Sequence, residues 1–138
     1  MMDAVLEKQM GSDQANQDII VIVDDDDAAR DSLKTLLEVQ GFAVESFETC
    51  EDFLKSPALR RNGCLVLDVH LPGMSGLELM DELAQRRIAH RVILVTGRND
   101  KAIKDRAAAL GAAALLEKPI DFDALMAAIE GPADRSHT

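Results

Sequence analysis

The chain has 138 residues, of which 47% are apolar and 29% are charged, a composition typical of one folded globular domain and unlike that of a disordered chain. Its 25 acidic residues outnumber its 15 basic ones, and the net charge of −10 argues against direct binding to nucleic acid or to an anionic membrane surface, because both need a basic face. Two cysteines, Cys50 and Cys64, are too few for a disulfide framework.

Residues 1–17 are polar and contain acids, so they lack the apolar core of a signal peptide. We predict a mobile leader or a short loose helix for this segment. No apolar run approaches the roughly 20 residues that span a bilayer. We therefore predict a cytoplasmic protein without membrane contact, with one domain over residues 18–131 and a loop-like tail over residues 132–138.

Five apolar segments predict strands. The continuous runs at 19–23, 64–67 and 92–95 are rich in β-branched residues or leucine, which is typical of strands buried on both faces of a parallel sheet. Residues 43–47 alternate as an edge strand does, and residues 112–116 form a weaker fifth run. Cys64, inside one of these runs, is interpreted as a reduced core residue.

Helical segments lie between the strands, and capping residues mark several of their ends. Thr49 and Asp121 are candidate N-caps, and Gly41 provides a stop signal. The predicted helices cover residues 27–40, 50–55, 75–86, 101–110 and 122–130. Strands that alternate with helices predict an α/β fold, a doubly wound five-stranded parallel sheet with five helices distributed over both faces. In such sheets functional residues gather at the carboxyl ends of the strands.

Polar residues stand at the ends of four predicted strands. Four acids, 24–27, follow the first strand, Asp68 ends the third, Thr96 ends the fourth, and Lys118 follows the fifth. Each also has a purely structural interpretation. Asp26 or Asp27 can cap the next helix, Asp68 can begin a turn, Thr96 can be an ordinary strand residue, and Lys118 an ordinary solvated one.

Together these residues favour a metal-assisted site. Clustered carboxylates at one sheet edge repel each other by about 4 kcal/mol per pair, at about 4 Å and an effective dielectric constant of ~20. A cation offsets this repulsion, and Mg²⁺ suits hard oxygen ligands and phosphate oxygens. Lys118 adds a positive charge and Thr96 a hydroxyl group, so we predict a phosphoryl-handling site in which Asp68 is the nucleophile.

Four segments carry a resemblance to a known family: VIVDDDDAARDSL at the first strand and helix, VLDVHLPGMSGLEL around Asp68, VTG ending at Gly97, and LLEKP ending at Pro119. In this order, each at a strand end, they resemble the receiver domain of two-component response regulators over residues 18–131. The resemblance implies the flavodoxin-like strand order 2-1-3-4-5 and a phosphorylation switch that is not itself an enzyme. The sequence around Asp68 is similar to the same segment of receiver domains that precede a helix-turn-helix domain in longer proteins.

The resemblance also implies roles for individual residues. Asp68 accepts the phosphoryl group from a sensor histidine kinase or a phosphotransfer protein. Asp25 binds Mg²⁺ directly, Asp24 binds it through water, Asp68 is a ligand, and the main-chain carbonyl of His70 completes the protein's share of the metal shell. Thr96 and Lys118 contact the phosphoryl oxygens, and the peptide bond between Lys118 and Pro119 is expected to be cis.

One position departs from the family pattern. Three residues before Lys118 the family usually has an aromatic side chain that turns inward on phosphorylation, and here that residue is Leu115. We therefore expect the signal to lie mainly in the loop 97–100 and the helix 101–110. The predicted surface for a downstream protein comprises this helix, the strand 112–116 and the helix 122–130. Phosphorylation-dependent homodimerisation is left open.

Three alternatives remain at this level. A haloacid-dehalogenase-type phosphatase needs a second aspartate two residues after the nucleophile, where this chain has His70. A flavodoxin-like electron carrier shares the sheet order but usually stacks its flavin on aromatic rings, and the chain has four Phe and no Trp or Tyr. The chain is also compatible with the receiver part of a longer transcriptional regulator. We expect a single-domain regulator, because residues 132–138 do not resemble a linker.

Overall fold

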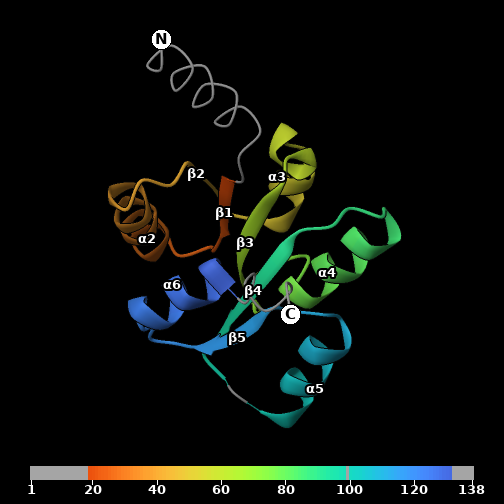
Figure 1. Ribbon diagram of the computed structural model, residues 1–138. Helices are drawn as coiled ribbons and strands as arrows, with labels where there is room; N and C mark the ends of the chain where they lie inside the picture. The colour runs from red at the N-terminus through yellow and green to blue at the C-terminus, as the bar shows by residue number, and fades with distance from the viewer. Residues whose placement is uncertain (1–18, 99, 132–138) are drawn as a thin grey trace, which may run out of the picture.

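The computed structural model describes residues 19–98 and 100–131, and the predicted leader and tail lie outside this part of the chain. Its centre is a parallel sheet of five strands in the order β2-β1-β3-β4-β5 (Figure 1). The order and the parallel pairing are those predicted. The strands are β1 (Ile19–Val23), β2 (Val44–Phe47), β3 (Gly63–Asp68), β4 (Arg91–Thr96) and β5 (Ala114–Glu117).

The helices that join these strands have nearly the predicted bounds. They are α2 (Asp27–Val39), α3 (Cys50–Leu54), α4 (Gly76–Gln85), α5 (Lys101–Ala109) and α6 (Phe122–Glu130). A short 3₁₀ helix, η1 (Pro57–Arg60), was not predicted. It begins where the hydroxyl of Ser56 accepts a hydrogen bond from the amide of Ala58, next to Pro57, whose fixed φ suits a first helical position.

The helices cover both faces of the sheet, α2 and α6 on one face and α3, α4 and α5 on the other (Figure 1). Alternate side chains of β1 separate two cores, because successive residues of a strand point to opposite faces. Val21 belongs to the core that contains Phe53 of α3 and Leu79 of α4, whereas Ile22 belongs to the core that contains Leu37 of α2. Both cysteines are buried and neither forms a disulfide, which for Cys64 agrees with the prediction.

Since all five strands are parallel, their carboxyl ends lie along one edge of the sheet, and the helices that follow them begin there. At each of these starts the side-chain oxygen of the capping residue accepts a hydrogen bond from a main-chain amide of the first turn. The capping residues are Asp26, Thr49, Ser75, Asp100 and Asp121. The carboxyl edge is therefore built from capped helix starts and strand ends. Within the described residues, no helix has the length and hydropathy needed to cross a membrane.

Candidate functional site

Three carboxylates meet at the carboxyl edge. Asp24 and Asp25 directly follow β1, Asp68 ends the neighbouring strand β3, and one oxygen from each lies within 4.8 Å of the others. Asp68 is only 5% exposed, Asp24 is half-buried and Asp25 is exposed. The structure thus brings together the three acids that the sequence assigned to a metal.

The four consecutive acids after β1 divide into two pairs with different surroundings. Asp26 caps α2, since its Oδ1 accepts the amide of Ala29 at 3.0 Å, and Asp27 pairs with Arg30 one turn further on. The sequence left open which of these two acids is the cap. Asp24 accepts the amide of Asp26 at 2.9 Å and remains in the cluster.

Arg30 contributes to this arrangement in a way that the sequence did not predict. Its Nη1 donates to the main-chain carbonyl of Asp24 at 2.7 Å, and the same guanidinium pairs with Asp27. The hydrogen bond to Asp27 raises the pKa of Arg30, which therefore stays charged. The guanidinium group has several N–H donors pointing in different directions, so it can bond the Asp24 carbonyl and the Asp27 carboxylate at once. Arg30 thereby links the first turn of α2 to the residue that follows β1.

Both oxygens of Asp68 accept hydrogen bonds. Nζ of Lys118 donates to Oδ2 at 2.7 Å, and the amide of His70 donates to Oδ1 at 3.1 Å. Lys118 reaches this position because its own amide donates to the carbonyl of Thr96 at 2.8 Å, directly after β5. The bond between Lys118 and Pro119 is cis, as predicted.

Thr96 is completely buried, and its hydroxyl is engaged by the loop that follows it. Oγ1 donates to the carbonyl of Arg98 at 2.8 Å and accepts the amide of Arg98 at 3.0 Å. The predicted contact of Thr96 with phosphoryl oxygens requires this hydroxyl to leave the carbonyl of Arg98, because it has a single proton to donate.

Electrostatics tie Lys118 to the acid cluster. Burial alone lowers the pKa of this ammonium group, but the hydrogen bond to Asp68 and the charges of Asp68, Asp24 and Asp25 together raise it above its usual value. Burial also raises the pKa of Asp24 above 3.8, and the neighbouring acids act in the same direction, although the Asp26 amide and Lys118 oppose them. One lysine thus offsets only part of the negative charge.

The donor set fits a hard divalent cation. The side-chain oxygens of Asp24, Asp25 and Asp68 can approach one ion together, and oxygen-only coordination is the kind that Mg²⁺ prefers. His70 follows Asp68 by two residues, and its carbonyl remains the predicted fourth protein ligand.

The loop between β3 and α4 lies close against the acid cluster. Leu71 is buried, and Gly76 approaches the strand so closely that a Cβ added there would lie 2.4 Å from the carbonyl oxygen of Asp68. Glu51, on α3, accepts the amide of Met74 in this loop at 3.0 Å. The sequence did not predict this contact, because the two residues are far apart in the chain.

Leu115, at the position usually aromatic in the resembling family, lies in β5 opposite Leu94. It is half-buried and packs on the core that contains Leu79. Beside it is a small cavity of about 240 Å³ with a largely alanine lining that includes Ala107 and Ala112. The side chain therefore has free volume on the side of α5.

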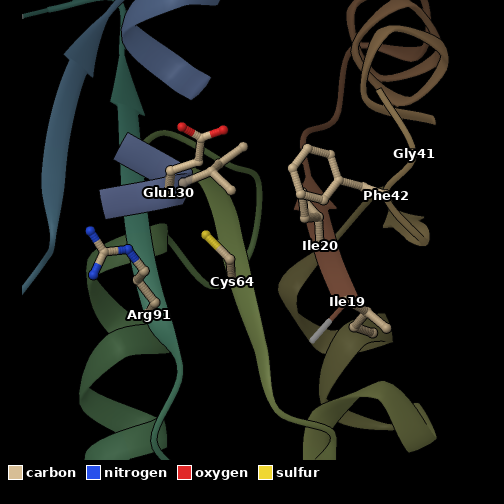
Figure 2. Close-up of a pocket in the computed structure, with 8 residues that line it drawn as sticks. Ile19, Ile20, Gly41, Phe42, Cys64, Arg91 and Glu130 are labelled. Atoms are coloured by element: carbon tan, nitrogen blue, oxygen red, sulfur yellow. The ribbon is translucent and has the colours of Figure 1, made fainter. Parts of the chain in front are cut away.

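Another cavity lies at the opposite edge of the sheet. It has a volume of about 550 Å³, and residues at or near the amino ends of three strands, Ile20, Cys64 and Arg91, contribute to its lining (Figure 2). It contains none of the predicted site residues. The candidate site lies at the carboxyl edge, beside a cavity of about 350 Å³ whose lining includes Asp24 and Lys118.

Comparisons with known proteins agree on one family. The family model of the response regulator receiver domain matches residues 20–130. The transcriptional regulatory protein FixJ of Azorhizobium caulinodans is 44% identical over 115 residues, which cover 83% of this chain and 54% of that protein. The crystal structure of FixJ-N has a TM-score of 0.73 at 37% identity and covers 83% of this chain and 92% of that one.

A receiver domain protein described as CheY-like, from Methanospirillum hungatei, has a TM-score of 0.77 at 30% identity. The match covers 87% of this chain and 96% of that one. By contrast, the chain spans only about half the length of the FixJ proteins that it matches.

Proposed function

The chain belongs to the response regulator receiver family, and we propose that it acts as a phosphorylation switch that accepts one phosphoryl group on Asp68. Membership of this family replaces the two alternatives from the sequence, a dehalogenase-type phosphatase and a flavodoxin-like carrier. The observation that carries the proposal is the position of Asp68, a nearly buried carboxylate that touches Lys118 and shares a small volume with Asp24 and Asp25.

The chemistry follows from these residues. A carboxylate oxygen of Asp68 attacks the phosphorus atom, and the bond between phosphorus and the donor's imidazole nitrogen breaks, so an acyl phosphate replaces a phosphohistidine. Lys118 stays protonated at neutral pH, because its pKa is raised, and its ammonium group offsets the charge of the phosphoryl oxygens. Asp25, Asp68 and the carbonyl of His70 would hold Mg²⁺ directly and Asp24 would hold it through water, and the ion would neutralise charge on the acids and the phosphoryl group.

Thr96 connects the acceptor to the surface of the molecule. If its hydroxyl donates to a phosphoryl oxygen, it abandons the carbonyl of Arg98, and the loop before α5 loses that hydrogen bond. Leu115 has no hydroxyl group to exchange partners, so we propose that the change is carried by the loop 97–100 and α5. Phosphorylation on Asp68 is thereby reported on the face made by α5, β5 and α6.

The partners follow from this reaction. We propose that a sensor histidine kinase or a phosphotransfer protein supplies the phosphoryl group. Because histidine kinases take their phosphoryl group from ATP, we propose that the chain acts in the cytoplasm. A downstream protein binds the face of α5, β5 and α6, and the chain itself needs no catalytic turnover.

Mass spectrometry after incubation with Mg²⁺ and acetyl phosphate tests the proposal. The parent protein should gain one phosphoryl group, and Asp68→Asn should gain none. Asp31→Asn is a matched control, because it removes the same charge from an exposed position on α2. Labelling of Asp68→Asn as complete as that of the parent would show that the acceptor is elsewhere.

A further inference from the structure

The loop between β3 and α4 is held firmly at both ends. At its start the amide of Val69 donates to the carbonyl of Val95 in β4 at 2.9 Å, and Leu71 is buried in the core. At its end Ser75 and Glu78 form a capping box, in which each side chain accepts the other's main-chain amide. These contacts leave the middle of the loop, residues 72–74, to be fixed by something else.

Glu51 makes the contact in the middle. Its Oε2 accepts the amide of Met74 at 3.0 Å, and a Cβ added at Gly73 would lie 2.7 Å from the same oxygen. Gly73 has a φ of +76°, a conformation that favours glycine. The backbone at 73–74 is thus wrapped closely around the carboxylate of a residue from another helix.

The helix that carries Glu51 is anchored well enough to act as a support. Thr49 caps α3 by accepting the amide of Asp52 at 3.0 Å, and Cys50 and Phe53 are completely buried. Sγ of Cys50 also lies 3.8 Å from the carbonyl oxygen of Ser75, which places the start of α3 against the end of the loop. Glu51 itself is exposed, so its substitution leaves the core intact.

We infer that Glu51 is a positioning residue of the acceptor site. It fixes residues 73–74, the part of the loop that the contacts of Val69, Leu71 and Ser75 leave unheld, and a loop fixed along its whole length keeps the main chain at His70 in place for the metal. The inference rests on the proposed function. The carboxylate acts through the amide of Met74 and touches neither the acceptor nor the acid cluster. Outer residues that orient metal ligands typically contribute about 10- to 100-fold to metal affinity, and an exposed hydrogen bond belongs at the low end of that range.

Three variants separate the hydrogen bond from the charge. Glu51→Ala removes both, Glu51→Gln keeps an acceptor oxygen at the same place, and Asp52→Ala removes one charge from the next position of α3, whose side chain is not part of the contact. Two measurements are made on each full-length variant. The first is hydrogen exchange at the amide of Met74 without metal, and the second is Mg²⁺ affinity by titration.

In Glu51→Ala we expect exchange at Met74 to be faster and Mg²⁺ affinity to fall about tenfold, whereas Glu51→Gln and Asp52→Ala stay within about threefold of the parent. Parent-like behaviour of Glu51→Ala in either measurement overturns the inference. So does a Glu51→Gln protein as weak as Glu51→Ala, because the charge and not the hydrogen bond is then responsible. A parent protein that binds no Mg²⁺ refutes the proposed function as well, and the two failures are thereby distinguished.

Discussion

Two loops at the same edge of the sheet differ in how they are held. After β3 there is so little room that a Cβ at Gly73, in the loop, would lie 2.7 Å from an oxygen of Glu51, and one at Gly76, the first residue of α4, would lie 2.4 Å from the carbonyl oxygen of Asp68. After β4 there is open space at Gly97, where a Cβ would meet nothing within 4 Å. Arg98 in this second loop is held by Thr96, the residue directly before Gly97.

The helices that follow the two loops differ in the same way. The buried residues of α4 are Gly76, Leu79, Met80 and Leu83, whereas those of α5 are Ile103 and Ala107. A helix that buries large side chains resists displacement, because moving it exposes apolar surface. Under the proposed function, the side after β3 would form the rigid support of Asp68 and the side after β4 would be the one that responds.

The largest expected effect is on the free energy of unfolding, when a buried side chain in α4 or in α5 is replaced by alanine. Leu79 is completely buried, so Leu79→Ala should lower the free energy of unfolding by about 4 kcal/mol, whereas Ile103→Ala, at a position 8% exposed beside small residues, should lower it by about 2 kcal/mol. Urea unfolding measures both values. Equal losses would mean that α5 is packed as firmly as α4.

Substitutions in the acid run after β1 test the proposed metal ligands. On the proposed assignment Asp25→Ala removes a direct ligand and should weaken Mg²⁺ binding by about 100-fold, and Asp24→Ala removes a water-mediated one and should weaken it by about tenfold. Asp27→Ala should change little, because Asp27 pairs with Arg30 outside the cluster. A titration that ranks Asp27 above Asp25 contradicts this assignment.

Hydrogen exchange with and without Mg²⁺ and beryllofluoride, a phosphoryl mimic, tests the response of the open side. We expect protection to change by several-fold or more across residues 97–110, in addition to changes near Asp25 and Asp68. The simpler view is that the alanines of α5 reflect only high helix propensity. Changes confined to the loops at Asp25 and Asp68 would support that view and exclude α5 as the responding element.

The smallest expected effect concerns the lifetime of the acyl phosphate. His70 and Arg98 are exposed, one in each loop, and each lies two residues beyond a site residue. We expect them to flank the route of attacking water, so His70→Ala and Arg98→Ala should change the decay rate about threefold while Mg²⁺ affinity stays constant. Decay rates of both variants within about twofold of the parent's would show that the two side chains are merely solvated.

The sequence predicts the fold wherever the signal is local. The run Ile19–Val23 and the caps Thr49 and Asp121 mark their elements directly, because each depends on neighbouring residues. The fifth strand was placed two residues too early, since Ala112 and Ala113 are apolar but alanine has little preference for strands.

The candidate site was predictable to the extent that parallel topology dictates it. The rule for strand ends brings Asp24, Asp68 and Lys118 together without any knowledge of side-chain packing. The contacts of Arg30 with the Asp24 carbonyl and of Glu51 with Met74 were not predictable. Both depend on where a long side chain of a helix reaches the neighbouring main chain, which no local pattern in the sequence encodes.

The acid cluster also makes the stability of the fold depend on its ionic surroundings. Burial raises the pKa of Asp24, so its ionised form opposes folding, and in the metal-free protein this one group contributes stability that is present at low pH and is lost as the pH rises through the raised pKa. A cation that binds only the folded chain reverses this loss, by about 1.4 kcal/mol at a free concentration ten times its dissociation constant. Magnesium, bound as proposed, would therefore stabilise the fold as well as serve the transfer of the phosphoryl group.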